Sequence, residues 1–128
     1  MNILLDTHAF LWFVADDPRL SDTARSLIEA EASQPFLSIA SLWEMAIKVS
    51  LGKLKFEQPY ELFIPQQLTI NGIGILNLSL EHTAAISTLP FHHRDPFDRV
   101  IAVQANLEKM CVVSADSALD AYGVERVW

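Results

Sequence analysis

Two aspartates stand at the ends of short apolar runs that have the character of buried strands. Asp6 directly follows the run at residues 3–5, and Asp116 follows the run at residues 111–114 after one intervening residue. In an open parallel sheet the carboxyl ends of the strands share one edge, and ligands bind there. We therefore expect Asp6 and Asp116 to lie at a common ligand-binding edge.

Two further acids have apolar surroundings. Glu44 is embedded in the largely apolar residues 39–47, early in the helix expected after the second strand, and Asp98 lies in the first turn of a later helix. Both positions can open onto the same edge, so four carboxylates are expected to converge. Each also has a simpler interpretation, as a cap, a turn or helix-start residue, or for Glu44 as the partner of Lys48 alone.

Converging carboxylates repel one another unless a cation binds between them. Mg²⁺ is bound through carboxylates, water and substrate phosphates, and two-metal phosphodiesterases use such sites. Without metal, at least one of the four acids should bind its proton more tightly than a free side chain. Asp116→Asn should then leave the metal-free protein at least as stable as the wild type. Asp95 and Asp120 are candidate accessory acids.

The remaining reactive side chains form no recognised catalytic pattern. The histidines lack metal-ligand spacing and have structural or surface interpretations, and no nucleophile elbow, P-loop or dinucleotide-binding fingerprint is present. Cys111 lies in an apolar run and is expected to be a buried, reduced thiol. Five basic residues could hold substrate phosphates near the acids: Lys48, Lys53, Lys55, Arg94 and Arg99.

Short strand-like runs alternate with helical patterns, which is typical of an α/β fold with a parallel sheet. The expected strands are residues 3–5, 36–39, 73–77, 111–114 and 125–128. The expected helices are residues 7–15, 22–32, 40–51, 61–71, 80–88 and 96–108. Ser21 and Asp95 are the predicted N-caps of two of them, and Pro65 interrupts the pattern of a third.

The length of 128 residues fits one domain over residues 1–128, with a core that needs no disulfide. Sixteen acids against nine bases give a net charge of −7, which argues against a polybasic membrane anchor and against binding of nucleic acid by bulk positive charge. No basic residue precedes Arg19, so the N-terminus does not resemble a signal peptide, and we expect a cytoplasmic protein. The uncharged residues 62–80 contain Pro65 and Gly72, which favours a helix, a turn and a strand over a membrane span.

The first expected helix is apolar on every face at residues 10–14. A helix of this kind is either fully buried or covered by a partner. Both interpretations stay open, because a domain this small has difficulty in burying every face of a helix.

The chain resembles the PIN-domain family, and within it the VapC-like toxin ribonucleases of bacterial toxin–antitoxin pairs. The resemblance covers nearly the whole chain and rests on the order and spacing of four motifs. They lie at residues 4–8 (LLDTH), 41–48 (SLWEMAIK) with 52–54 (GKL), 93–99 (HRDPFDR), and 114–116 (SAD).

The resemblance implies a PIN-like three-layer α/β/α fold with a central, mainly parallel sheet of about five strands. It also implies an RNA-cleaving active site that binds Mg²⁺ or Mn²⁺, a homodimer, and a cognate antitoxin that covers the groove. The implied catalytic and metal-binding residues are Asp6, Glu44, Asp98 and Asp116, with Ser114, Lys48 and Asp95 in support. Asp95 occurs only in some branches of the family and is not counted as a ligand.

The expected chemistry is hydrolysis of RNA phosphodiester bonds, in which water attacks phosphorus in line and leaves a 5′-phosphate. Two other readings are kept open. One is a catalytically inactive PIN-like scaffold that only binds a partner. The other is a receiver-like signalling domain, which needs a lysine after its last strands, whereas Lys109 precedes the fourth expected strand.

Overall fold

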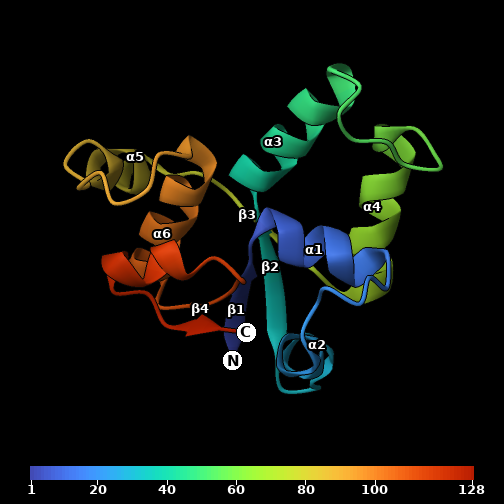
Figure 1. The fold of residues 1–128 in the computed structure, drawn as a ribbon, viewed down its shortest axis with the longest axis horizontal. Helices are drawn as coiled ribbons and strands as arrows, with labels where there is room; N and C mark the ends of the chain where they lie inside the picture. Colours follow the sequence, from blue (N-terminus) through green and yellow to red (C-terminus); the bar gives the residue numbers. More distant parts are fainter.

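The computed structural model describes residues 1–128 and contains one five-stranded sheet in which every neighbouring pair of strands is parallel. The strand order is β3-β2-β1-β4-β5 (Figure 1). The strands are β1 (Asn2–Leu5), β2 (Gln34–Ser38), β3 (Gly74–Leu76), β4 (Cys111–Val113) and β5 (Arg126–Val127). The expected parallel sheet of about five strands is therefore confirmed.

Six α-helices and one 3₁₀-helix connect the strands. They are α1 (Thr7–Val14), α2 (Asp22–Glu29), α3 (Ile39–Ser50), α4 (Tyr60–Asn71), α5 (Leu80–Ile86), α6 (Pro96–Glu108) and η1 (Ser117–Tyr122). None of the helices has both the length and the apolar composition that crossing a membrane requires. The uncharged stretch at residues 62–80 forms the end of α4, a turn at Gly72 and β3, as expected.

Strand β1 divides the core into two layers because successive side chains of a strand point to opposite faces of the sheet. Ile3 and Leu5 pack with residues of α1, α2, α3 and α4 on one face. Leu4 packs with residues of α6 and η1 on the other face, and α5 contacts α6. The result is the expected three-layer arrangement, with the central strand buried on both faces.

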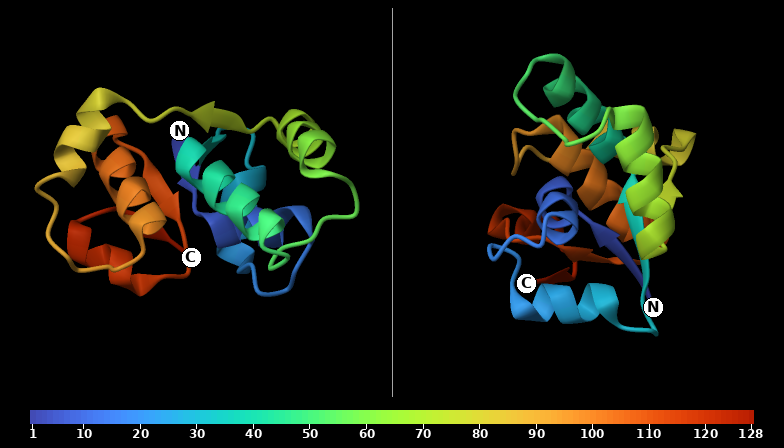
Figure 2. Two further views of the ribbon diagram at one scale, coloured as in Figure 1. Left: turned by 90° about the horizontal axis from the view of Figure 1, so that it is seen from above. Right: turned by 90° about the vertical axis from the view of Figure 1, so that its right-hand side faces the viewer.

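The start of each site-bearing helix follows directly from the end of a strand or from a capping residue. In Figure 1, α1 and α3 leave the upper ends of β1 and β2. The predicted N-caps are confirmed: the side chain of Ser21 accepts from the N–H of Ala24, and Asp95 accepts from the first turn of α6. Figure 2 shows α2 near the N-terminus, at the amino ends of the strands and away from the edge formed by their carboxyl ends.

The structure differs from the sequence-based expectation mainly at the element ends. Strand β2 begins at Gln34 because it pairs with β1 from Asn2 onward, a long-range pairing that no local pattern reveals. The 3₁₀-helix η1 was not predicted. Pro65 lies inside α4 without ending it. Proline has no N–H, so the carbonyl of Glu61, one turn earlier, loses its helical partner. Glu61 and Pro65 are both exposed, so water can bond that carbonyl instead.

Candidate functional site

Asp6 and Asp116 lie side by side because β1 and β4 are adjacent parallel strands. The backbone N–H of Asp6 donates to the carbonyl of Val113 at 3.1 Å. Both aspartates are also helix N-caps: the carboxylate of Asp6 accepts from the N–H of Ala9 at 2.7 Å, and that of Asp116 accepts from the N–H of Ala118 at 3.0 Å. The capping interpretation is thus correct, and the caps hold both carboxylates at the edge of the sheet.

Glu44 is buried and accepts a hydrogen bond on each of its carboxylate oxygens. It is only 6% exposed. One carboxylate oxygen accepts from the hydroxyl of Thr7 at 2.6 Å, and the other accepts from the ammonium of Lys48 at 2.9 Å. Glu44 is therefore not a partner of Lys48 alone, because Thr7 also ties it to the first residue of α1, next to Asp6.

Asp98 has the least compensated negative charge. It lies in the first turn of α6, one turn after the N-cap Asp95. Burial and the neighbouring charge of Asp95 raise the pKa of Asp98 to about 7, against the attraction of His93, and the charges of Asp6 and Glu44 add to the rise. Burial and the surrounding negative charges thus both act against the ionised form of Asp98.

Asp6 is buried, and this burial raises the pKa of its carboxyl group, although hydrogen bonds from Ser114 and from the N–H of Ala9 oppose the rise. The nearby Asp116 carboxylate adds a small repulsion. Ser114 is fully buried, and its hydroxyl also accepts from the backbone N–H of Asp116 at 3.0 Å. Ser114 therefore connects the two strand-end aspartates.

A histidine that the sequence analysis had treated as structural or superficial lies within the acidic cluster. The Nε2 atom of His93 is 2.6 Å from a carboxylate oxygen of Asp116 and 3.4 Å from one of Asp98. Its Nδ1 atom accepts from the backbone N–H of Asp95 at 3.0 Å. Because Nδ1 is occupied as an acceptor, the ring proton of neutral His93 is on Nε2, and the imidazole donates to the carboxylates.

This donor changes the electrostatics of Asp116. Burial alone would raise its pKa, but hydrogen bonds from His93 and from the N–H of Ala118 outweigh burial and lower it. The expectation that at least one of the acids binds its proton more tightly holds for Asp98 and Asp6. The further expectation, that removing the charge of Asp116 does not destabilise the metal-free protein, stays a prediction, and the lowered pKa of this carboxyl group counts against it.

Ligand atoms of His93, Asp98 and Asp116 lie within 4.8 Å of one another. Asp6 and Glu44 are outside this tightest group but influence Asp98 through their charges. No spacing rule could have identified His93, since it faces Asp116 only through the packing of residues 89–95 on η1. The structural role expected for the other histidines is confirmed for buried His82, which completes a capping box with Ser79 at the start of α5.

Of the five basic residues expected near phosphates, two have other roles. Lys48 pairs with Glu44. Arg99 is buried, and its guanidinium donates to the carbonyls of Pro90 and Leu89 rather than facing the acids. Asp120 pairs with Arg126 at 2.8 Å on the surface, which gives it no direct part in the cluster.

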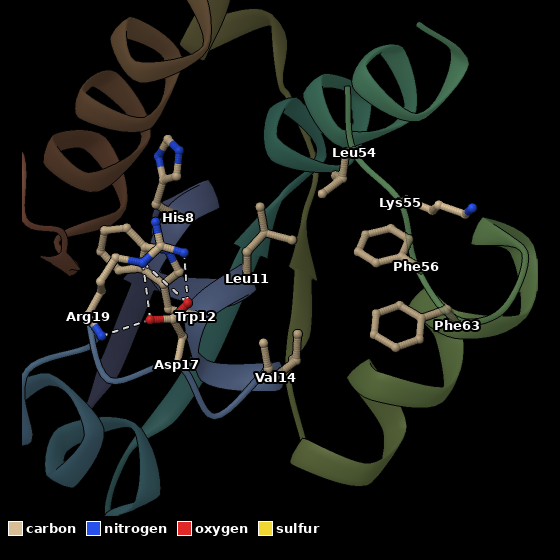
Figure 3. A pocket seen from close by; sticks show the side chains of 11 residues that line it. His8, Leu11, Trp12, Val14, Asp17, Arg19, Leu54, Lys55, Phe56 and Phe63 are labelled. Carbon is tan, nitrogen blue, oxygen red and sulfur yellow. Dashed lines mark hydrogen bonds and ion pairs between the residues drawn. The ribbon is translucent and has the colours of Figure 1, made fainter. Parts of the chain in front are cut away.

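A second feature is an apolar pocket of about 330 Å³ beside α1. Figure 3 shows Leu11, Trp12 and Val14 of α1 on one side of it, and Phe56 and Phe63 on the other. Phe56 and Phe63 stack with their ring centroids 4.4 Å apart. The exposed part of α1 therefore lines a groove and is not fully enclosed by the core.

A family model described as the PIN domain matches residues 3–125. A curated relative, Ribonuclease VapC16 of Mycobacterium tuberculosis (strain ATCC 25618 / H37Rv), is 34% identical over 71 residues. This match covers 52% of the chain and 50% of the relative, so it spans about half the length of that protein.

Three solved structures illustrate the similarity of the fold. VapBC2 from Rickettsia felis, bound to a DNA fragment from its promoter, has a TM-score of 0.75 at 16% identity and covers 99% of this chain and 98% of that chain. A toxin–antitoxin complex from Klebsiella pneumoniae has a TM-score of 0.66 at 16% identity, with 98% and 96% covered. FitAcB from Neisseria gonorrhoeae has a TM-score of 0.67 at 16% identity, with 100% and 97% covered. At these identities the likeness concerns the fold alone.

The opposite pKa shifts of Asp98 and Asp116 predict opposite effects on stability. Folded Asp98 holds its proton up to about pH 7, against an ordinary value of 3.8, so this group loses folding stability as the pH rises between the two values. In EDTA at pH 8, Asp98→Asn should therefore melt at a higher temperature than the wild type. The difference should shrink toward pH 5, as measured by calorimetry.

Asp116→Asn is the matched comparison within the same cluster. The lowered pKa of Asp116 means that its charge stabilises the fold above its ordinary pKa, and this contribution is lost only in acid. Asp116→Asn should thus melt below the wild type at pH 8. A melting temperature of Asp98→Asn below that of the wild type at pH 8 would show that the cluster is not under repulsion.

Proposed function

The chain belongs to the PIN domain family, and from this premise we propose that it is a metal-dependent endoribonuclease and the toxin of a toxin–antitoxin pair. The observation that carries the proposal is the convergence of four carboxylates around Asp98, whose pKa is raised to about 7. Such uncompensated negative charge is suited to a divalent cation. Family membership also removes the receiver-like alternative.

The donor set fits a hard divalent cation such as Mg²⁺ or Mn²⁺. Asp6, Glu44, Asp98 and Asp116 would supply only carboxylate oxygens, which these cations prefer. An ion bound there supplies positive charge that activates water and stabilises the leaving oxygen of a phosphodiester. Relief of the repulsion on Asp98 would contribute to its binding.

Neighbouring side chains set the direction in which each carboxylate points. Thr7 and Lys48 each hold one oxygen of Glu44, and Ser114 bonds both to Asp6 and to the backbone of Asp116. Because hydrogen bonds to ligand residues fix their orientation, these contacts preform the site. Asp95 has a different task, since its carboxylate accepts from the N–H groups of Phe97 and Asp98 and so fixes the start of α6.

His93 is the partner that orients Asp116. Its Nε2–H donates to the Asp116 carboxylate. The backbone N–H of Asp95 donates to Nδ1, so Nδ1 cannot carry the ring proton of the neutral imidazole. We therefore assign His93 as a positioning residue and not as a metal ligand, because a nitrogen that carries a proton has no lone pair for a metal.

The pocket beside α1 supports the second half of the proposal, a cognate antitoxin as partner. Leu11, Trp12 and Val14 are half-buried, and seven of the eleven lining residues are hydrophobic. Grooves of this type accept the apolar face of an amphipathic helix. The sequence left two interpretations of α1, burial in the core and contact with a partner. Ala9 and Phe10 are buried in the core, whereas Leu11, Trp12 and Val14 line the groove proposed for the partner.

The homodimer and the cytoplasmic location remain predictions, and so do the boundaries of the domain at residues 1–128. Trp43 is exposed and lines a small apolar pocket between α3 and α6. Its ring packs edge-on against that of Phe97, with the ring centroids 5.3 Å apart. This apolar surface is the proposed dimer contact.

The purified chain should cleave RNA with Mg²⁺ or Mn²⁺ and should lose this activity in EDTA. Asp98→Asn and Glu44→Gln keep the side-chain shape and remove a ligand charge, so each should lower the cleavage rate by on the order of 100-fold. Asp22→Asn, an exposed acid on α2, is the matched control and should cleave normally. Cleavage at the wild-type rate by folded Asp98→Asn would reject the assignment of Asp98. A wild type that never cleaves RNA would favour the alternative of a catalytically inactive scaffold.

Removing His93 should weaken metal binding because Asp116 loses the donor that orients it. We expect His93→Ala to bind Mn²⁺ roughly 10- to 100-fold more weakly by calorimetry. His93→Gln, which keeps an N–H donor, should recover part of this loss. Equal or tighter binding of Mn²⁺ by His93→Ala would show that the imidazole competes with the cation.

Truncation of Trp12 should weaken binding of the antitoxin, because large aromatic side chains in grooves contribute most to affinity. Trp12→Ala should raise the Kd by on the order of 30-fold. Leu80→Ala removes an exposed hydrophobic side chain outside this pocket, and as the control it should bind normally. Hydrogen exchange should show added protection across residues 9–15 in the complex, and unchanged protection there would reject the groove.

A further inference from the structure

The segment at residues 89–94 joins α5 to α6 without regular secondary structure, yet its backbone is held by side chains from two other elements. Arg99 of α6 donates to the carbonyls of Pro90 at 2.9 Å and Leu89 at 3.2 Å. The hydroxyl of Tyr122, in η1, donates to the carbonyl of Pro90 at 2.8 Å. We call this segment the 89–94 loop.

Tyr122 also fixes the second half of the loop. Its hydroxyl accepts from the backbone N–H groups of His92 at 3.1 Å and His93 at 2.9 Å. Arg99 is only 6% exposed and forms no ion pair, so a buried positive charge is used to bond loop carbonyls. Burial of a charge is unfavourable unless its hydrogen bonds are made. The loop is therefore tightly positioned.

This rigid loop displays an aromatic side chain to solvent. Phe91 is 87% exposed, the most of any large hydrophobic residue in the chain. The guanidinium carbon of Arg99 lies 4.1 Å from the centroid of its ring, so one face of the ring rests on a cation. The high exposure leaves the opposite face free. The stacking surface is thus preorganised, because the loop and the Phe91 side chain lose little conformational freedom when a ligand binds.

The stacking surface lies close to the acidic cluster. Phe91 is two residues before His93, whose ring contacts Asp116, and two residues span at most about 7 Å. Arg94, which directly follows His93, is exposed and forms no ion pair. It is unpaired although the acids outnumber the bases and the net charge is −7. An aromatic side chain and an unpaired guanidinium therefore lie within two residues of His93, the residue of this loop that contacts the acids.

An unpaired RNA base with its phosphate fits this combination better than a protein partner does. Single-stranded RNA is bound by stacking of bases on aromatic side chains and by cations that contact the backbone. A protein hot spot is usually surrounded by other apolar contacts that exclude water. The neighbours Pro90, His92 and Arg94 are all exposed, and two of them are polar.

We propose that Phe91 is a base-stacking residue, which holds an unpaired nucleotide of the RNA next to the cleaved bond, while Arg94 contacts a neighbouring phosphate. The assignment rests on the proposed ribonuclease function. Phe91 positions the substrate and touches no reacting atom. Its loss should therefore raise KM and leave kcat at saturating RNA nearly unchanged.

Binding can be measured without cleavage in an Asp98→Asn background. The probe is a short, unstructured oligoribonucleotide containing a fluorescent adenine analogue whose emission is quenched by stacking. The parent protein should quench the probe, and Phe91→Ala should abolish the quenching and weaken binding by roughly 5- to 150-fold. Phe91→Trp should retain both properties. Phe91→Leu should lose the quenching although it still covers Arg99, which separates stacking from simple apolar bulk.

Phe91 is exposed, so these variants should fold, and melting curves check this directly. Arg94→Ala should weaken binding and reduce the salt dependence by about one released ion. If the wild type cleaves RNA but Phe91→Ala retains the same KM and the same quenching, the stacking proposal is wrong and the ribonuclease proposal stands. If the wild type never cleaves RNA, the ribonuclease proposal fails, and the binding assay still decides whether Phe91 stacks. Loss of antitoxin affinity in Phe91→Ala with unchanged RNA affinity assigns the loop to the protein partner and overturns the proposal.

Discussion

Parallel pairing of β1 between β2 and β4 is the constraint on which the rest of the structure depends. Ile3, Leu4 and Leu5 of the central strand are buried between the two layers, which requires apolar side chains there, and the polar Asp6 follows where the strand ends. Asp6 and Asp116 occupy that position on neighbouring strands. The helix that follows β2 then brings Glu44 to the same edge, and α6 adds Asp98. The sheet thereby concentrates negative charge at one place.

The protein compensates this charge unequally. Thr7 and Lys48 donate to Glu44, the N–H of Ala9 donates to the N-cap Asp6, and His93 donates to Asp116. Burial and the neighbouring charge of Asp95 raise the pKa of Asp98 to about 7, whereas the hydrogen bonds that Asp116 accepts lower the pKa of that carboxyl group. A site arranged in this way is oriented before a cation arrives, and the remaining repulsion on Asp98 favours the binding of one.

Two surfaces surround this edge and differ in chemistry. The pocket beside α1 is largely apolar and suits a helix of a partner protein. The 89–94 loop presents one aromatic ring on a buried arginine, next to an unpaired Arg94, which suits a single-stranded nucleic acid. If the proposed function is correct, separate surfaces of this kind would allow RNA and an antitoxin to be recognised by different side chains.

The sequence by itself determined the alternation of strands and helices, the caps Ser21 and Asp95, and the convergence of the four acids, because these depend on local patterns and on the general geometry of parallel sheets. Tertiary structure decided the pairing of Gln34 with Asn2, the burial of Arg99 and the contact of His93 with Asp116. The sequence had indicated a phosphate-binding role for Arg99 and a structural one for His93. Their roles depend on carbonyls, amides and carboxylates brought close by packing between distant segments, and such contacts leave no periodicity or spacing in the sequence.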